Sequence, residues 1–203
     1  MNIKVNTHSS IQIENFAFDP YGITDTTFKA KYIFITHTHF DHLDIESIKK
    51  IIQDDSVIIA PTDAKKTLEE NFKNKIFYVL PKDELNLHGV NVEVFASYNI
   101  DKNFHPKENN WVGYKIIYNG KSYAVLGDTD ATPELENLTS VDVLFVPIGG
   151  TYTMNATEAA TLANKIKPKL VIPVHYGSVV GTKEDEQTFI SNLNPEIKYE
   201  ILL

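Results

Sequence analysis

Residues 37–42 read His37-Thr38-His39-Phe40-Asp41-His42 and follow the apolar run 33–35 after a single residue, Thr36. This loop holds three of the seven histidines of the 203-residue chain, together with a carboxylate. Imidazole and carboxylate groups are ligands for zinc, iron and manganese. His37 and His39 alternate, so in an extended segment their side chains point to the same side. Asp41 and His42 are adjacent and point apart, which favours a second ion beside the first.

Two ions need further ligands, and three positions later in the chain offer them. Asp128 and His175 each come directly after an apolar stretch that reads as a strand, and His105 lies in a polar loop. Taken alone, His175 fits a ligand or a hydrogen-bonded strand-end histidine equally well. Asp128 alone is more typical of a turn formed with Gly127. For His175 and Asp128 the residues alone therefore leave a ligand role and a structural role open.

A length of 203 residues allows one domain with a substantial core or at most two small ones, and a single domain covering residues 1–203 is expected. Hydrophobic residues make up 42% and charged residues 23% of the chain, and it has no cysteine. Any metal must therefore take nitrogen and oxygen ligands, and a reducing cytoplasm is the expected compartment. The chain has no apolar run of about 18 residues, so no membrane span is expected. The N-terminal residues lack the apolar core of a signal peptide.

The charge balance argues against nucleic acid as a partner and favours a small-molecule substrate. The formal net charge is −8, from 19 basic and 27 acidic residues, and every basic residue is a lysine. A substrate phosphate would have to be bound by lysine, backbone amides or the metal, because no guanidinium is present. The composition does not indicate an oligomeric state.

Hydrophobic periodicity predicts alternating strands and helices, and hence an α/β (α+β) protein with two sheets covered by helices. Asp44 is expected to cap a helix with Ile45, Ile48, Ile51 and Ile52 on one face. Asn119-Gly120 predicts a hairpin turn, and Asn155 with Glu158 predicts a capping box. Further helices are expected at about 63–72, 156–166 and 183–193. Strands are expected at 3–5, 11–18, 31–36, 57–60, 76–80, 84–88, 91–97, 112–118, 121–126, 142–146, 170–174 and 197–202.

The loop at 37–42 matches the H-x-H-x-D-H motif of the metallo-β-lactamase fold superfamily. The chain resembles a branch of small metal-dependent hydrolases that includes ascorbate-6-phosphate lactonase, and the resemblance covers essentially its whole length. The further matching segments are Thr7-His8-Ser9-Ser10, Asp19-Pro20, Phe40-Asp41-His42-Leu43, Gly127-Asp128-Thr129-Asp130, Pro147-Ile148-Gly149-Gly150 and Pro173-Val174-His175-Tyr176-Gly177.

The resemblance implies a four-layer αββα sandwich with two divalent metal ions at one edge of the sheets. Zinc is the first expectation, with manganese or iron as alternatives. His88 competes with His105 as the third histidine of the first metal. The ligand sets that the resemblance implies are His37, His39 and His105 for one ion, Asp41, His42 and His175 for the other, and Asp128 as the bridge.

Such a site would hydrolyse a small ester, lactone or phosphodiester with a metal-bridging hydroxide. Asp41 is expected to orient or deprotonate the nucleophile. His8 is expected either to contact a metal ligand or the substrate, or to be a plain turn residue. Tyr152 and Tyr176 are candidate hydrogen-bond donors to the leaving group, although tyrosines at strand ends are often packing residues. The polar loop 99–110 is a candidate lid that carries His105.

Two other functions remain as alternatives to the hydrolase. A non-catalytic metal-binding or regulatory domain on the same fold usually loses ligands, whereas all seven predicted positions carry suitable side chains here. A diiron redox protein is less favoured, because the flavodiiron pattern usually has glutamate where this chain has His39. The sequence does not select one substrate.

Overall fold

The computed structural model describes residues 3–203, which form two compact units. One unit contains the described residues up to Val79 together with Leu203, and the other contains Leu80–Leu202. Each unit is built around one mixed sheet. The expectation of a single domain stays a prediction. In the described residues no helix is long and apolar enough to cross a bilayer.

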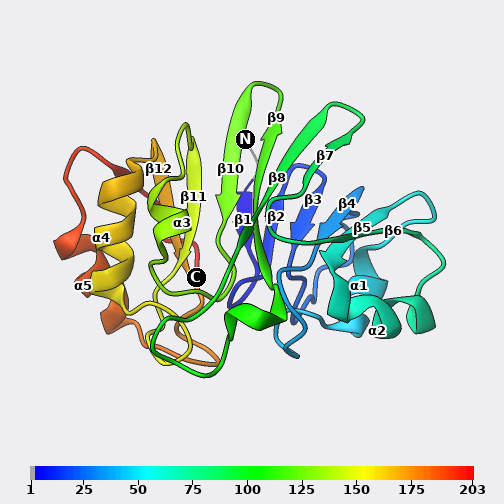
Figure 1. Cartoon of the computed structure of the whole chain (residues 1–203), viewed down its shortest axis with the longest axis horizontal. Helices are drawn as coiled ribbons and strands as arrows, with labels where there is room; N and C mark the ends of the chain where they lie inside the picture. Colours follow the sequence, from blue (N-terminus) through cyan, green and yellow to red (C-terminus); the bar gives the residue numbers. More distant parts are fainter. Residues whose placement is uncertain (1–2) are drawn as a thin grey trace. The chain divides into compact units, whose positions relative to one another are not determined.

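The first unit is a six-stranded sheet in the order β1-β2-β3-β4-β5-β6 (Figure 1). Its first three strands are antiparallel, and β3 to β6 run parallel to their neighbours. The carboxyl ends of β3, β4 and β5 therefore meet at one edge. The strands are β1 (Ile3–Val5), β2 (Ile11–Ile13), β3 (Phe16–Phe18), β4 (Tyr32–Phe34), β5 (Val57–Pro61) and β6 (Lys75–Val79).

Two helices, α1 (Ile45–Ile51) and α2 (Lys65–Asn71), cover one face of this sheet, and a short 3-10 turn, η1 (Thr62–Ala64), leads into α2. Ile48 and Ile51 of α1 are buried in the same core cluster as strand residues such as Ile33 and Ile58. The Asp44 side chain accepts a hydrogen bond from the Glu46 amide, so the expected N-cap is confirmed.

The second unit is a seven-stranded sheet in the order β13-β12-β11-β10-β9-β8-β7. Strands β10 to β13 are parallel to their neighbours, and β7 to β10 are antiparallel. The strands are β7 (Glu84–Leu87), β8 (Val90–Ala96), β9 (Val112–Tyr118), β10 (Lys121–Val125), β11 (Val143–Pro147), β12 (Leu170–Val174) and β13 (Lys198–Tyr199).

The helices of the second unit are α3 (Pro133–Glu136), α4 (Ala156–Ile166) and α5 (Glu184–Asn192), with a 3-10 turn, η2 (Lys107–Asn109), after His105. α4 packs on β11 and on α5 (Figure 1). The buried face of α4 repeats at helical spacing through Ala156, Ala159, Ala160 and Ala163, and these small side chains permit close contact. The capping box of Asn155 and Glu158 has both of its hydrogen bonds.

The structure departs from the expected elements at four places. The strand expected at 11–18 is two strands joined by a turn in which Glu14 has a φ of 52°. The short helix Pro133–Glu136 was not predicted, because one turn leaves no periodic signal. The final strand spans only Lys198–Tyr199 of the expected 197–202. Pro61 closes β5 as its last residue instead of following it, which a strand end tolerates.

Candidate metal centre

In the first unit, the site residues follow the carboxyl ends of parallel strands. Asp19 comes directly after β3, and Thr36 comes two residues after β4. Asp19 is fully buried and receives hydrogen bonds from the Thr36 amide at 2.8 Å and from the Thr36 hydroxyl at 2.7 Å. These bonds join the ends of β3 and β4, just before the loop that carries His37.

Asp19 also orients the imidazole of His42. Nδ1 of His42 lies 2.7 Å from Oδ2 of Asp19. Because a carboxylate only accepts, Nδ1 carries the proton and the ring has its lone pair at Nε2. Metal-bound histidines are usually held by such a carboxylate at the second nitrogen. The sequence predicted no role for Asp19, although this residue directly follows an apolar strand.

Asp19 reaches His37 through Thr36. The Thr36 hydroxyl gives its proton to Asp19, so its oxygen accepts from Nδ1 of His37, 3.0 Å away. His37 therefore also has its lone pair at Nε2, and this atom lies 3.1 Å from Nδ1 of His39. Two nitrogens bound to one tetrahedral zinc ion at about 2.0–2.1 Å would be separated by about 3.4 Å. The expected convergence of His37 and His39 is thus present in the first unit.

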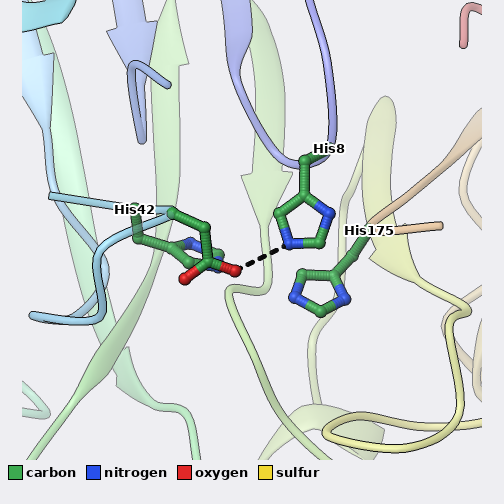
Figure 2. A group of neighbouring side chains, drawn as sticks. His8, His42 and His175 are labelled. Carbon is green, nitrogen blue, oxygen red and sulfur yellow. Dashed lines mark ion pairs between the residues drawn. The ribbon is translucent and has the colours of Figure 1, made fainter. Parts of the chain in front are cut away.

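His8 lies against Asp41. Nε2 of His8 is 3.0 Å from Oδ2 of Asp41, and Figure 2 draws this ion pair as a dashed line. Nε2 of His42 is 3.9 Å from the same oxygen. The ligand atoms of His8, Asp41 and His42 lie within 4.8 Å of one another. His8 is fully buried with a φ of 55°, a backbone conformation that a plain turn more often gives to glycine or asparagine.

In the second unit, Asp128 and His175 follow β10 and β12, the two strands that pair in parallel with β11 on either side. Asp128 comes three residues after β10, and His175, labelled in Figure 2, directly follows β12. Nε2 of His175 lies 2.8 Å from Oδ2 of Asp128, and Nε2 of His105 lies 3.3 Å from the same oxygen. All three side chains are buried.

A close backbone approach holds His175 in place. Its φ is 61°, in the left-handed region. A Cβ atom on Gly149 would lie 2.3 Å from the His175 carbonyl oxygen, so only glycine fits at that position. The Gly149-Gly150 pair therefore lets the segment after β11 pass directly beside the histidine.

Asn99 orients the third histidine of this group. Its Oδ1 accepts from Nδ1 of His105 at 3.0 Å and from the His105 amide at 3.1 Å, and its Nδ2 donates to the Tyr152 carbonyl at 2.9 Å. His105 therefore has its lone pair at Nε2, on the side of Asp128. The competitor His88 is exposed, with a φ of 51°, between β7 and β8. Sequence reasoning missed Asn99, since its role depends on contacts across a loop.

We expect Asn99→Leu to weaken zinc binding about 10- to 100-fold, because His105 loses the acceptor that fixes its ring. Asn99→Asp keeps an acceptor for Nδ1 and is expected to recover most of the affinity. Chelator competition on the purified variants measures both values. Asn103→Leu, at an exposed position of the same loop, is the matched control. Equal losses in the aspartate and leucine variants would contradict this role.

The loop 99–110, the candidate lid, is anchored at three points, and its role as a lid stays a prediction. Besides the Asn99–Tyr152 bond, Lys102 forms an ion pair with Asp130. Lys107 donates to Glu134 on α3 at 2.8 Å, and its Nζ lies 4.3 Å from the centre of the Tyr98 ring. These attachments hold His105 beside Asp128.

The ion pair with Lys107 lowers the pKa of Glu134 to about 2 from its usual 4.5. This contribution to stability is present above pH 4.5 and is lost as the pH falls toward 2. Glu134→Gln is therefore expected to lower the unfolding temperature at pH 7, with a difference from wild type that shrinks by pH 2.5. Thermal unfolding at both pH values measures it. Glu108→Gln, an exposed acid of the same loop, should match wild type; a pH-independent effect of Glu134→Gln would contradict the explanation.

The two tyrosines lie in different surroundings. Tyr176 is buried, and burial together with the neighbouring Glu186 carboxylate of α5 raises the pKa of its hydroxyl. That setting indicates packing against α5. Tyr152 is half-buried, and its ring meets the edge of Phe104 with 4.7 Å between centroids. A role of either hydroxyl toward a leaving group stays a prediction.

The donor sets of both units suit a divalent cation. In each of them, nitrogen lone pairs and carboxylate oxygens are brought together in buried positions, which is unfavourable unless a proton or a cation lies between them. Histidine and aspartate without sulfur are compatible with zinc, manganese or iron. The sequence predicted that these histidines and aspartates bind metal, and the chemistry of the two donor sets is consistent with that prediction.

The chain belongs to the beta-lactamase superfamily domain family, whose model matches residues 3–175. This range includes every predicted metal ligand. The chain is 34% identical over 166 residues to a UPF0173 protein of Pyrococcus abyssi, covering 80% of this chain and 75% of that protein. It is 28% identical over 220 aligned positions to a UPF0173 metal-dependent hydrolase of Bacillus velezensis, covering 95% and 92%.

A solved structure supports the same fold. A candidate metal-dependent hydrolase from Parabacteroides distasonis superposes with a TM-score of 0.85 and 30% identity, covering 98% of this chain and 91% of that one. The expected fold class, the mixed α/β metallo-β-lactamase fold, is therefore confirmed. The narrower resemblance to ascorbate-6-phosphate lactonase stays a prediction.

Proposed function

We propose that this protein is a metal-dependent hydrolase that cleaves a small ester, lactone or phosphodiester at a centre of two divalent ions. Zinc is the first candidate, and manganese or iron are the others. Three side chains of its own would hold each ion, and Asp128 would be a further ligand shared by the two. The proposed sets are His37, His39 and His105 for one ion, and Asp41, His42 and His175 for the other.

The observation that carries this proposal is the hydrogen bonding that fixes the imidazoles. Asp19 accepts from Nδ1 of His42, and the Thr36 hydroxyl, which donates to Asp19, accepts from Nδ1 of His37. Both rings therefore carry their proton on Nδ1 and present a lone pair at Nε2. Asn99 does the same for His105 in the other unit. Preorganised neutral imidazoles are a requirement of metal binding, and a purely structural histidine does not need them.

The reaction follows from the charges of the site. When bound, divalent ions would lower the pKa of a water molecule and polarise the scissile bond. Asp41 orients the attacking water, and His8 holds the Asp41 carboxylate through the contact of 3.0 Å. Burial of these groups strengthens each electrostatic interaction with the developing charge. The only group that this reaction requires of the substrate is a scissile carbonyl or phosphoryl group.

Metal removal and reloading test this function. Dialysis against a chelator is expected to abolish hydrolysis of 4-nitrophenyl esters, γ-lactones and bis(4-nitrophenyl) phosphate, and added zinc, manganese or iron(II) is expected to restore at least one of these activities. Metal-loaded protein that hydrolyses none of the three would contradict the proposal and favour a metal-binding regulatory domain. Turnover that survives complete metal removal would contradict it as well.

A further inference from the structure

Exposed apolar side chains occur beside the proposed metal ligands. Of the six large apolar side chains exposed in the described residues, four lie within five residues of a proposed ligand: Phe40, Ile100, Phe104 and Val179. Phe40 is 68% exposed and stands between His39 and Asp41, and Phe104 is 46% exposed and precedes His105. Single exposed apolar residues are ordinary on protein surfaces, but here most of them lie close in sequence to a proposed ligand.

Phe104 is held in a fixed position. Its ring meets the ring of Tyr152 edge to face, with 4.7 Å between centroids. The Tyr152 carbonyl in turn accepts from Asn99, the residue that orients His105. An exposed phenyl group is therefore fixed within one residue of a proposed ligand. Such a group offers a surface for an apolar part of a substrate.

Each lysine of the loops that carry the proposed ligands is paired with a carboxylate. In the described chain these lysines are Lys102, Lys107 and Lys183, and each forms an ion pair with a carboxylate, respectively of Asp130, Glu134 and Glu186. The pKa of Glu134 is lowered to about 2, so its pair with Lys107 stays ionised at any ordinary assay pH.

The acidic groups outnumber the lysines around the His105 loop. Asp101 and Glu108 of this loop, together with Asp130 and Glu134, give four carboxylates against two lysines. The sequence has no arginine. Apart from the proposed metal ions themselves, a phosphorylated substrate would meet more carboxylates than lysines at the His105 loop, and each of the two lysines there is already in an ion pair.

We propose that the substrate is an uncharged ester or lactone whose apolar part contacts Phe104, rather than a phosphorylated compound. This inference rests on the proposed function and narrows its substrate class. The apolar part gains affinity from the exposed phenyl ring, and the paired lysines give no compensating attraction for a phosphate.

A chain-length series tests the apolar contact. With metal-loaded protein, kcat/KM for 4-nitrophenyl acetate, butyrate and hexanoate is expected to rise about two- to fourfold for each added methylene. Phe104→Ser is expected to flatten this series, with its largest loss on the hexanoate. Tyr199→Ser removes an aromatic residue that is also 46% exposed but lies in β13, and should keep the wild-type slope.

Inhibition by inorganic phosphate tests the charges around the His105 loop. Wild-type esterase activity is expected to resist inorganic phosphate, and Glu134→Gln, which releases Lys107, is expected to increase inhibition by phosphate at least threefold. A flat chain-length series, or faster turnover of 4-nitrophenyl phosphate than of the esters, would overturn the substrate class and leave the hydrolase intact. Absence of hydrolysis of every ester, lactone and phosphodiester would overturn the proposed function, and this inference with it.

Discussion

Asp128→Asn is expected to remove both bound metal and hydrolytic activity. The Asp128 carboxylate lies 2.8 Å from Nε2 of His175 and 3.3 Å from Nε2 of His105, so one oxygen serves two proposed ligands. Loss of an outer-shell partner alone typically costs 10- to 100-fold in metal affinity or activity. Loss of the shared carboxylate is therefore expected to cost more than about 100-fold in kcat/KM.

Elemental analysis and steady-state kinetics on the same samples measure this change. The matched control is Asp142→Asn, which replaces a partly buried carboxylate that accepts from the Ser122 amide at 2.8 Å and pairs with Lys169. We expect that control to retain metal and turnover. Full metal content and activity in Asp128→Asn would exclude Asp128 from the centre.

Substitutions of Asp19 are expected to lower metal affinity and stability, because Asp19 orients His42 and Thr36. Asp19→Asn places an amide where the carboxylate accepts three hydrogen bonds from Thr36 and His42. His42 is then no longer held with its proton at Nδ1, and metal affinity is expected to fall about 10- to 100-fold. Asp19→Ala leaves buried donors unsatisfied, and is expected to lower the free energy of unfolding of the metal-free protein by about 3 kcal/mol.

Chelator competition measures the first effect, and urea unfolding of the metal-free protein measures the second. Asp25→Asn is the control, since Asp25 is an exposed acid of the same unit that pairs with Lys4. We expect it to match wild type in both measurements. If Asp19→Asn kept wild-type metal affinity, the orientation of His42 by Asp19 would have no functional role.

The elements with a local signal were predictable from the sequence. α4 has the expected bounds because its capping box and its buried small residues lie within the helix itself. The Asn119-Gly120 turn joins β9 and β10 as expected, with positive φ at both residues. The division of residues 11–18 into two strands was not predictable by periodicity, since every residue of β2 and β3 is buried and no alternation remains.

The candidate site was predictable where its residues are close together in the sequence. The loop at 37–42 carries two of the three ligands of each proposed set within six residues. The role of Asp19 was not predicted, because its partners Thr36 and His42 are distant in sequence and their contact depends on strand order. The role of Asn99 was not predicted, because its bonds to His105 close an irregular loop that has no periodic signal.

Anomalous diffraction from crystals of the zinc-loaded protein tests the central claim most directly. We expect two anomalous peaks per chain, about 3.5–4 Å apart, with Asp128 in contact with both. One peak should contact His37, His39 and His105, and the other Asp41, His42 and His175. No ordered peak at these residues, or peaks bound only elsewhere on the chain, would contradict the assignment of this protein as a dinuclear metal-dependent hydrolase.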